Sequence, residues 1–278
     1  MTPLAFVLLI FGISLVAGFL GSLLGLGGGI IVVPALTLLL GVDIRLAIGA
    51  SIVSVIATSS GAAAAYVRER LANLRVAMFL EIGTTLGAIT GAYLAGVLHT
   101  RLLFILFGAL LGYSAVAMLK KQPRAAVADA VPNALADRLQ LHGSYYDEAV
   151  GREIPYRVTN PGVGLGLMYL AGAASGLLGI GSGALKVPAM DLAMHLPMKV
   201  STATSNFMIG VTAAASAGLY FMRGQIDPFL AGPVAAGVLV GATVGSRLLG
   251  RIGGRSIRVV FVVVLTVVSF EMLWKGIA

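Results

Sequence analysis

The chain has 278 residues, of which 58% are hydrophobic and only 11% are charged, and its mean hydropathy is +0.99. A soluble domain carries roughly 25% charged residues to cover its surface, so this composition excludes a soluble fold. The formal net charge of +8 does not indicate nucleic-acid binding, because the basic residues cluster at the ends of apolar runs, where lipid headgroups and topology rules account for them. The absence of cysteine excludes disulfides, iron–sulfur clusters and thiolate metal sites.

Eight apolar runs follow one another, and each approaches or exceeds the roughly 20 residues that span a bilayer. They cover 4–24, 46–66, 76–98, 102–119, 161–180, 200–222, 229–249 and 259–274. Such runs are too long and too uniformly apolar for barrel strands. The first one lacks a basic leader and a small-residue cleavage site, which favours a retained membrane element over a cleaved signal peptide. The sequence therefore predicts an all-α polytopic membrane protein.

The chain repeats itself at an offset of 154 residues. A glycine cluster and a proline in the first half return in register in the second half: Gly25, Gly27, Gly28, Gly29 and Pro34 match Gly179, Gly181, Ser182, Gly183 and Pro188. We expect a first transmembrane repeat in 1–121, a polar connector in 122–160 and a second repeat in 161–278. A duplicated, glycine-broken apolar segment is the best sequence indication of a transporter's binding site.

Each repeat begins with a segment of unusual length, 4–41 in the first copy and 161–195 in the second. As one helix, 4–41 would be roughly 57 Å long, too long for one crossing and short for two. The glycine cluster divides the segment into either two crossings or a re-entrant hairpin, and both contribute an even number of crossings. Three further spans follow, so the second repeat is expected to be inverted relative to the first.

The distribution of positive charge orients the chain. Lys120, Lys121 and Arg124 open the connector, which predicts a cytoplasmic connector and both termini on the outer face. The expected location is the cell membrane, the inner membrane in a Gram-negative bacterium. The tyrosine-rich run 144–147 is interpreted as part of a solvated linker in preference to a partner site.

The glycine clusters allow three interpretations. A dinucleotide-binding loop is rejected, because no strand precedes the cluster and no acidic ribose partner follows. A flexible hinge or close helix packing remains open. We favour a helix break at mid-membrane, whose backbone amides and positive half-helix ends face an anion. The candidate binding residues are Gly27, Gly28, Gly29, Gly181, Ser182 and Gly183. The regular glycine stripes at 83–91 and 237–245 are interpreted as helix packing.

Polar residues inside the apolar runs extend this candidate site. Ser51 and Thr58 recur in register as Ser205 and Thr212, and Asn206 adds an amide beside them. Such hydroxyls often bond only to their own helix or bridge helices. Their duplication on one helix face favours a polar lining of the transport path.

Charged residues within the membrane are costly and point to function. Lys186 lies three residues after Gly183 and is the candidate cation for an anionic substrate; its alternatives are snorkelling or pairing with Asp191. Glu81 and Asp191 are candidate proton carriers, and Glu81 is alternatively a partner of Lys186. His195 and Lys199 are expected at the cytoplasmic mouth, either attracting anions or simply lying at the interface.

Enzymatic function is not expected. The chain has no H-E-x-x-H motif for zinc, and Ser182 lacks the first glycine of an intramembrane-protease G-x-S-G. A serine hydrolase would also need a base beside its nucleophile, and none is indicated here.

The repeated G-x-G-G-G-x4-P pattern, together with 184–190 and 198–206, resembles the TauE/SafE family of membrane transporters. The resemblance covers both repeats, and Ser182 departs from it where the family usually keeps glycine. It implies a secondary transporter, without a cofactor, that exports sulfite, an organosulfonate or another small sulfur-containing anion. An anion channel and a non-transport sensor or scaffold remain alternatives, and a homo-oligomer stays open.

Overall fold

The computed structural model describes residues 3–120, 133–148, 150–179, 181–249, 252 and 254–277. Lys121 and Arg124, on which the orientation of the connector partly depends, lie outside these residues. The first half contains α1 (Pro3–Leu24), α2 (Gly29–Pro34), the π-helix η1 (Ala35–Leu39), α3 (Ile44–Arg68), α4 (Leu74–Ala95) and α5 (Thr100–Lys120). The connector contains α6 (Ala134–Arg138), β1 (Gly143–Asp147) and β2 (Arg152–Tyr156). The second half contains α7 (Pro161–Leu178), α8 (Gly183–Pro188), η2 (Ala189–Ala193), α9 (Met198–Met222), α10 (Pro228–Leu249) and α11 (Gly254–Ile277).

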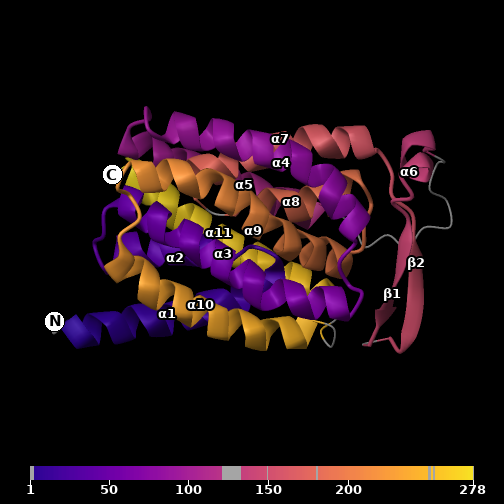
Figure 1. The fold of residues 1–278 in the computed structure, drawn as a ribbon, viewed down its shortest axis with the longest axis horizontal. Helices are drawn as coiled ribbons and strands as arrows, with labels where there is room; N and C mark the ends of the chain where they lie inside the picture. Colours follow the sequence, from indigo (N-terminus) through magenta and orange to yellow (C-terminus); the bar gives the residue numbers. More distant parts are fainter. Residues whose placement is uncertain are drawn as a thin grey trace.

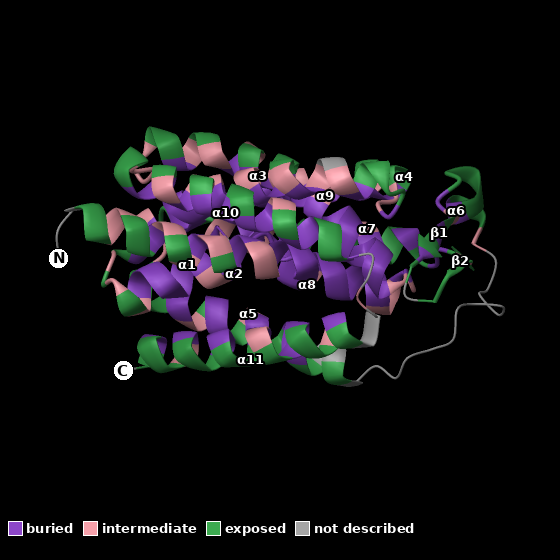
Figure 2. Cartoon of the chain, turned by 90° about the horizontal axis from the view of Figure 1, so that it is seen from below, coloured by how far each residue is buried: buried purple, intermediate pink, exposed green. Residues whose placement is uncertain are grey.

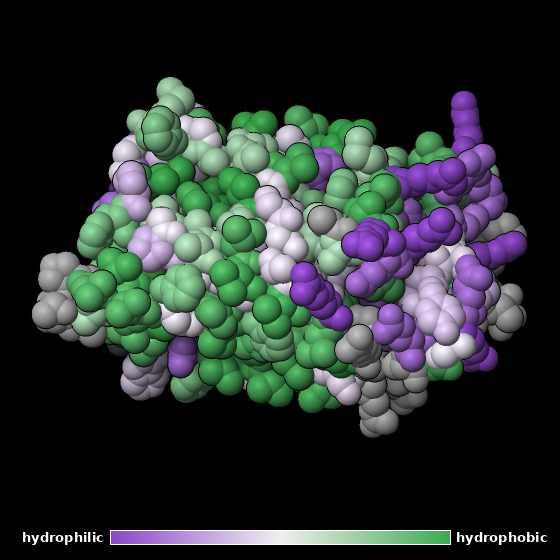
Figure 3. Space-filling view, turned by 60° about the horizontal axis from the view of Figure 1, so that its bottom comes forward, coloured by the Kyte–Doolittle hydropathy of each residue, from purple (hydrophilic) through white to green (hydrophobic). Residues whose placement is uncertain are grey.

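Six helices in the described part of the chain are long and apolar enough to cross a membrane: α1, α3, α4, α7, α10 and α11. Their outer faces carry exposed apolar side chains, such as Met78, Ile82 and Leu86 of α4, which suit contact with lipid. Hydrophobic side chains cover most of the flank of the bundle, and hydrophilic ones gather at the end that carries β1 and β2 (Figure 3). These features confirm the prediction of an all-α polytopic membrane protein.

The sequence repeat reappears in the helix boundaries. The elements α2, η1, α3 and α4 return as α8, η2, α9 and α10, with both ends of each element displaced by 154 residues. The ends of α1 and α7 obey the same offset, at Leu24 and Leu178. One local sequence pattern therefore produces the same break and the same helix lengths twice.

The chain turns back at each glycine cluster. Gly29, the first residue of α2, lies beside Ser51 and Val55 of α3, yet α3 begins at Ile44, and only four residues separate its start from the end of η1. The segment from Gly29 to Leu39 therefore runs back along α3 to the end at which α3 starts. Its six and five residues span roughly 16 Å, about half of the ~30 Å hydrocarbon core. Of the two options left open by the sequence, this geometry is the re-entrant hairpin.

The two glycine stripes pack helices of one half against helices of the other. A side chain on Gly87 of α4 would overlap the backbone oxygen of Tyr169 in α7, and one on Gly241 of α10 would overlap that of Leu15 in α1. The two contacts are equivalent at the 154-residue offset. Close backbone approach through small residues is a common way to pack membrane helices, so the structure gives these stripes the packing role expected from their spacing.

The equivalent helices α3 and α9 run in opposite directions. Gly49 near the start of α3 lies against Gln225, just after the end of α9. Asn73, which follows α3, donates its backbone N–H to the Thr204 hydroxyl near the start of α9. Both termini lie at one end of the bundle, and the β1–β2 hairpin lies at the other (Figure 1).

The connector departs from the expected solvated linker. Residues 143–147 form β1, which pairs antiparallel with β2. Tyr145 and Tyr156 are buried, and Asn73 of the bundle donates to the Leu141 carbonyl oxygen and the Tyr156 hydroxyl. The predicted solvated run 144–147 is only half solvated, because Tyr145 and Asp147 are buried whereas Ser144 and Tyr146 are exposed.

Candidate functional site

The two glycine breaks contact each other between α3 and α9. The Ser51 hydroxyl donates to the Gly179 carbonyl oxygen at 2.6 Å, and its equivalent Ser205 donates to the Gly25 carbonyl oxygen at 2.8 Å. A side chain on Gly183 would overlap the Gly25 carbonyl oxygen. Each half thus anchors the broken helix of the other half. The single hydroxyl hydrogens of Ser51 and Ser205 are occupied by these carbonyls in this conformation.

The breaks use backbone conformations that favour glycine. Gly27 and Gly28 have φ of 78° and 62°, and their equivalents Gly181 and Ser182 have φ of 75° and 57°. Left-handed backbone is unfavourable for residues with a Cβ, so Ser182 is strained where Gly28 is not. The Ser182 hydroxyl donates to the Gly181 carbonyl oxygen at 2.7 Å. This sequence departure therefore places a buried polar side chain inside the second break.

Thr58 and Asn206 both lie near the first break. The Thr58 hydroxyl donates to the Ser54 carbonyl oxygen of its own helix, and it also lies next to Gly28. The Asn206 amide donates to the Ser22 carbonyl oxygen at 2.6 Å, near the end of α1. The Asn206 Oδ1 atom is buried and accepts no hydrogen bond within the described residues. Asn206 thus keeps one amide oxygen available beside the break.

Two tyrosines that were not among the predicted site residues also hold the helix ends. The Tyr66 hydroxyl donates to the Ser22 carbonyl oxygen at 2.9 Å, and the equivalent Tyr220 hydroxyl donates to the Gly176 carbonyl oxygen at 2.7 Å. The last carbonyls of a helix lack partners inside that helix. Tyr66 and Tyr220 are separated by the same 154 residues as the two glycine clusters, and this matched spacing was the sequence indication that linked them to the breaks.

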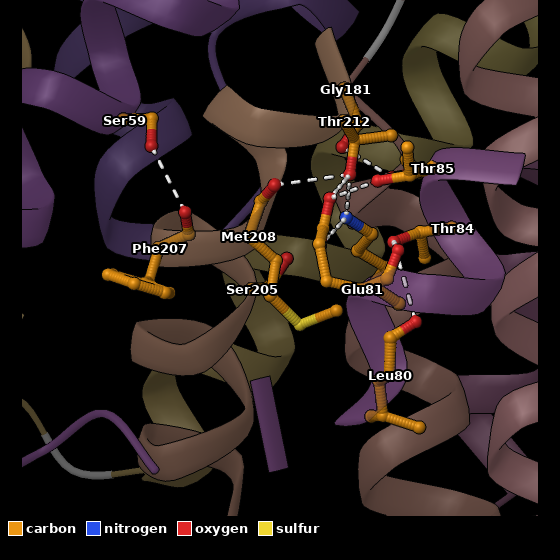
Figure 4. A network of polar contacts seen from close by, with 12 residues as sticks. Ser59, Leu80, Glu81, Thr84, Thr85, Gly181, Ser205, Phe207, Met208 and Thr212 are labelled. Atoms are coloured by element: carbon orange, nitrogen blue, oxygen red, sulfur yellow. Dashed lines mark hydrogen bonds and ion pairs between the residues drawn. The ribbon is translucent and has the colours of Figure 1, made fainter. Parts of the chain in front are cut away.

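A buried charge cluster lies beside the second break. Lys186 of α8 is fully buried, and its Nζ atom donates to the Thr212 hydroxyl at 2.5 Å. Thr212 in turn donates to Glu81 Oε1 at 2.6 Å, and Lys186 Nζ lies 3.6 Å from Glu81 Oε2. Figure 4 shows Glu81 and Thr212 converging with Thr85, whose hydroxyl reaches the same carboxylate. Three helices, α4, α8 and α9, therefore bring one cation and one carboxylate together.

The surroundings of this cluster favour the pairing of Lys186 with a carboxylate. Figure 2 shows α8 buried within the bundle, where an isolated ammonium group would be costly. The Glu81 side chain is 13% exposed, and its Oε2 atom accepts no hydrogen bond among the described residues. Glu81 is the carboxylate partner of Lys186 at this distance of 3.6 Å.

Asp191 lies in a different ion pair. Its Oδ2 atom accepts a hydrogen bond from Arg258 of α11 at 2.8 Å, and its side chain is 4% exposed. Of the two alternatives raised by the sequence, Lys186 has Glu81 as its carboxylate partner. Within the described residues, no group of three or more acidic or histidine side chains is arranged to hold a metal ion.

The connector end carries a second buried pair that the sequence did not indicate. Lys199, at the start of α9, lies 2.8 Å from Asp147 at the end of β1, and their side chains are 1% and 9% exposed. His195, expected at the same mouth, instead contacts the Thr159 hydroxyl through Nδ1 at 2.6 Å. The distance of 52 residues between Lys199 and Asp147 hid this pairing from the sequence.

Comparisons with known proteins give a consistent result. The family profile described as "Sulfite exporter TauE/SafE" matches residues 10–272. The chain is 28% identical over 281 residues to the "Probable membrane transporter protein YunE" of Bacillus subtilis (strain 168), with 99% of both chains covered. It is 27% identical over 262 residues to a "Probable membrane transporter protein" of Xylella fastidiosa (strain 9a5c), covering 93% of this chain and 92% of that one. No solved structure gives a significant match.

Proposed function

The chain belongs to the sulfite exporter TauE/SafE family of membrane transporters, and we propose that it moves a small sulfur-containing anion out of the cell. Sulfite, an organosulfonate or thiosulfate are the substrates considered. The observation that carries this proposal is the buried Lys186 ammonium beside the second glycine break, neutralised by Glu81. A fixed cation next to a broken helix is a suitable site for an anion that has left water.

In this proposal, the substrate replaces the Glu81 carboxylate at Lys186. The hydroxyls of Thr58, Ser182 and Thr212, the Asn206 amide and the backbone of Gly27–Gly29 and Gly181–Gly183 complete its shell. Ser51 and Ser205 contribute only if they leave the Gly179 and Gly25 carbonyls. Their first role is to hold the two breaks together between transport steps.

Alternating access follows from the arrangement of the halves. The antiparallel course of α3 and α9 supports a pair of inverted repeats around the breaks. Rocking of one half against the other would expose the site first to the connector side and then to the side of the termini. We place the connector in the cytoplasm and the termini outside, as positive charge near the connector favours.

The membrane potential suffices to drive export. Moving one negative charge outward across 100 mV, inside negative, is favourable by about 2.3 kcal/mol, roughly a 50-fold gradient at equilibrium. An importer would instead need a coupling ion. Glu81 is then the proton carrier that we favour, because it contacts Lys186 directly, whereas Asp191 is held by Arg258.

Counterflow distinguishes a carrier from a channel with the same lining. Proteoliposomes loaded with unlabelled sulfite are diluted into a trace of labelled sulfite, without a membrane potential. A carrier accumulates label transiently above its equilibrium level, because exchange is faster than net loss. Label that only equilibrates, together with single-channel currents in planar bilayers, would contradict alternating access and support an anion channel.

A further inference from the structure

The first turns of α9 contain buried polar groups that the central site does not use. The side-chain oxygens of Ser201 and Thr202 are buried and have no hydrogen-bond partner among the described residues. Unsatisfied buried hydroxyls are rare in native structures and call for an explanation such as a ligand or water. The backbone of Thr202 also lies directly against Gly25 of the first break. These groups therefore lie between the connector end and the central site.

One face of α9 connects the connector end with the central site. Lys199, Thr202 and Asn206 are spaced at i, i+3 and i+7, so they lie along the same side of the helix. Lys199 is buried at the connector end, and the Asn206 amide reaches the Ser22 carbonyl oxygen beside the break. A stripe that starts with a cation and continues with hydroxyl and amide donors offers an anion successive partners.

At the connector end of this stripe, the β1–β2 hairpin places the carboxylate of Asp147 against Lys199. Asp147 Oδ1 lies 2.8 Å from Lys199 Nζ, and Tyr145 donates its hydroxyl to Asp147 Oδ2 at 3.3 Å. Burial and the charge of Asp147 raise the pKa of Tyr145, so this phenol keeps its proton and remains a donor. The Asn73 amide ties the opposite strand to the bundle through the Tyr156 hydroxyl.

We propose that Lys199 and Thr202 form a second, connector-side subsite for a small oxyanion, and that Asp147 occupies it until the substrate arrives. The inference rests on the proposed anion transport, because the subsite would receive the same substrate. It assigns the hairpin a gating role: an anion that displaces Asp147 from Lys199 releases β1 from α9. The protein then has two lysine–carboxylate pairs, Lys199–Asp147 at the connector end and Lys186–Glu81 at the centre.

Hydrogen–deuterium exchange tests this subsite independently of flux. Purified full-length protein is incubated with sulfite, sulfate or chloride at matched ionic strength, and exchange of peptides covering 143–156 is followed. We expect at least one oxyanion to accelerate exchange of the hairpin relative to chloride, because Asp147 leaves Lys199. Unchanged exchange with both oxyanions would overturn the subsite, even in a preparation that transports sulfite. Accelerated exchange in a preparation without flux would support the subsite and count against the transport proposal.

Variants make the test specific. Asp147→Asn removes the carboxylate that pairs with Lys199, so exchange of the hairpin should already be fast in chloride and should respond little to sulfite or sulfate. Asp137→Asn is the matched control, because Asp137 pairs with His142 in the same connector and is exposed. The neutral double variant Asp147→Asn/Lys199→Gln avoids an uncompensated buried charge and should lose the oxyanion response. A wild-type response in this double variant would contradict the proposal.

Discussion

The Ser51 hydroxyl of α3 donates to the carbonyl oxygen of Gly179, at the break of the opposite half, at 2.6 Å. The equivalent bond joins Ser205 of α9 to Gly25 at 2.8 Å. These two contacts fix the relative position of the two broken helices, and thus of Lys186, which follows the second break. The candidate site therefore depends on both halves of the chain. Its lysine, Lys186, comes from the second half, and its carboxylate, Glu81, comes from α4 of the first half.

The paired serines predict matched losses of stability. Ser51→Ala and Ser205→Ala each leave a buried carbonyl without its donor, a cost of about 1–3 kcal/mol. Thermal unfolding in detergent should therefore show comparable decreases in melting temperature for the two variants. Ser60→Ala is the control, because the Ser60 hydroxyl bonds only to Ile56 of its own helix and is exposed. A decrease in only one serine variant would refute the equivalence of the two contacts.

Close contact of the breaks predicts intolerance to a single methyl group. In Gly183→Ala the added Cβ would overlap the Gly25 carbonyl oxygen, and we expect destabilisation of about 1–3 kcal/mol and loss of flux. Gly218→Ala on α9 is the matched change, because its Cβ would meet no atom within 4 Å. That control should be neutral or slightly stabilising, as alanine favours a helix over glycine. Equal behaviour of the two variants would argue against tightly packed breaks.

Strain at Ser182 predicts a stabilising substitution. With a φ of 57°, Ser182 adopts a conformation that glycine tolerates better, and the left-handed region costs other residues roughly 1–2 kcal/mol. Ser182→Gly should therefore raise the melting temperature, despite the loss of the hydroxyl bond to Gly181. Gly28→Ser, at the equivalent position of the first break, should lower it. The opposite order would show that the serine hydroxyl outweighs the backbone strain.

Competition at Lys186 predicts a tighter substrate site without Glu81. Glu81→Gln keeps the size of the side chain but removes the charge that neutralises Lys186. We expect the half-saturating sulfite concentration to fall roughly tenfold, equivalent to about 1.4 kcal/mol. Glu271→Gln on the exposed face of α11 is the control for loss of one carboxylate. A weaker site in Glu81→Gln would mean that Glu81 supports anion binding, instead of competing with it.

Much of the fold could be predicted from the sequence, because local patterns determine it. The apolar runs determine the long helices, and the glycine clusters at 25–29 and 179–183 locate both breaks. The hairpin could not be predicted in the same way. Its strands are short and polar, and the burial of Tyr145 and Tyr156 depends on packing next to the bundle.

The sequence allowed Glu81 as one possible partner of Lys186, but it could not predict the other contacts around the candidate site. Lys186 stood out as a charge inside an apolar run, yet its contact with Glu81 joins helices far apart in the chain. Ser51 and Ser205 were expected to face an anion, and they instead bond across the breaks. Their equal spacing from the glycine clusters was compatible with either role, because helical periodicity gives a face but no partner.

The most direct test of anion transport is sulfite flux into proteoliposomes under a clamped potential, comparing wild type with Lys186→Ala. We predict saturable, potential-driven flux in wild type and a loss of at least about 30-fold in the variant, since truncating a buried charge contact costs about 2 kcal/mol or more. The double variant Lys186→Met/Glu81→Gln removes the pair without leaving a buried charge, and it should also lack flux. Undiminished sulfite flux in both variants would contradict a substrate site at Lys186.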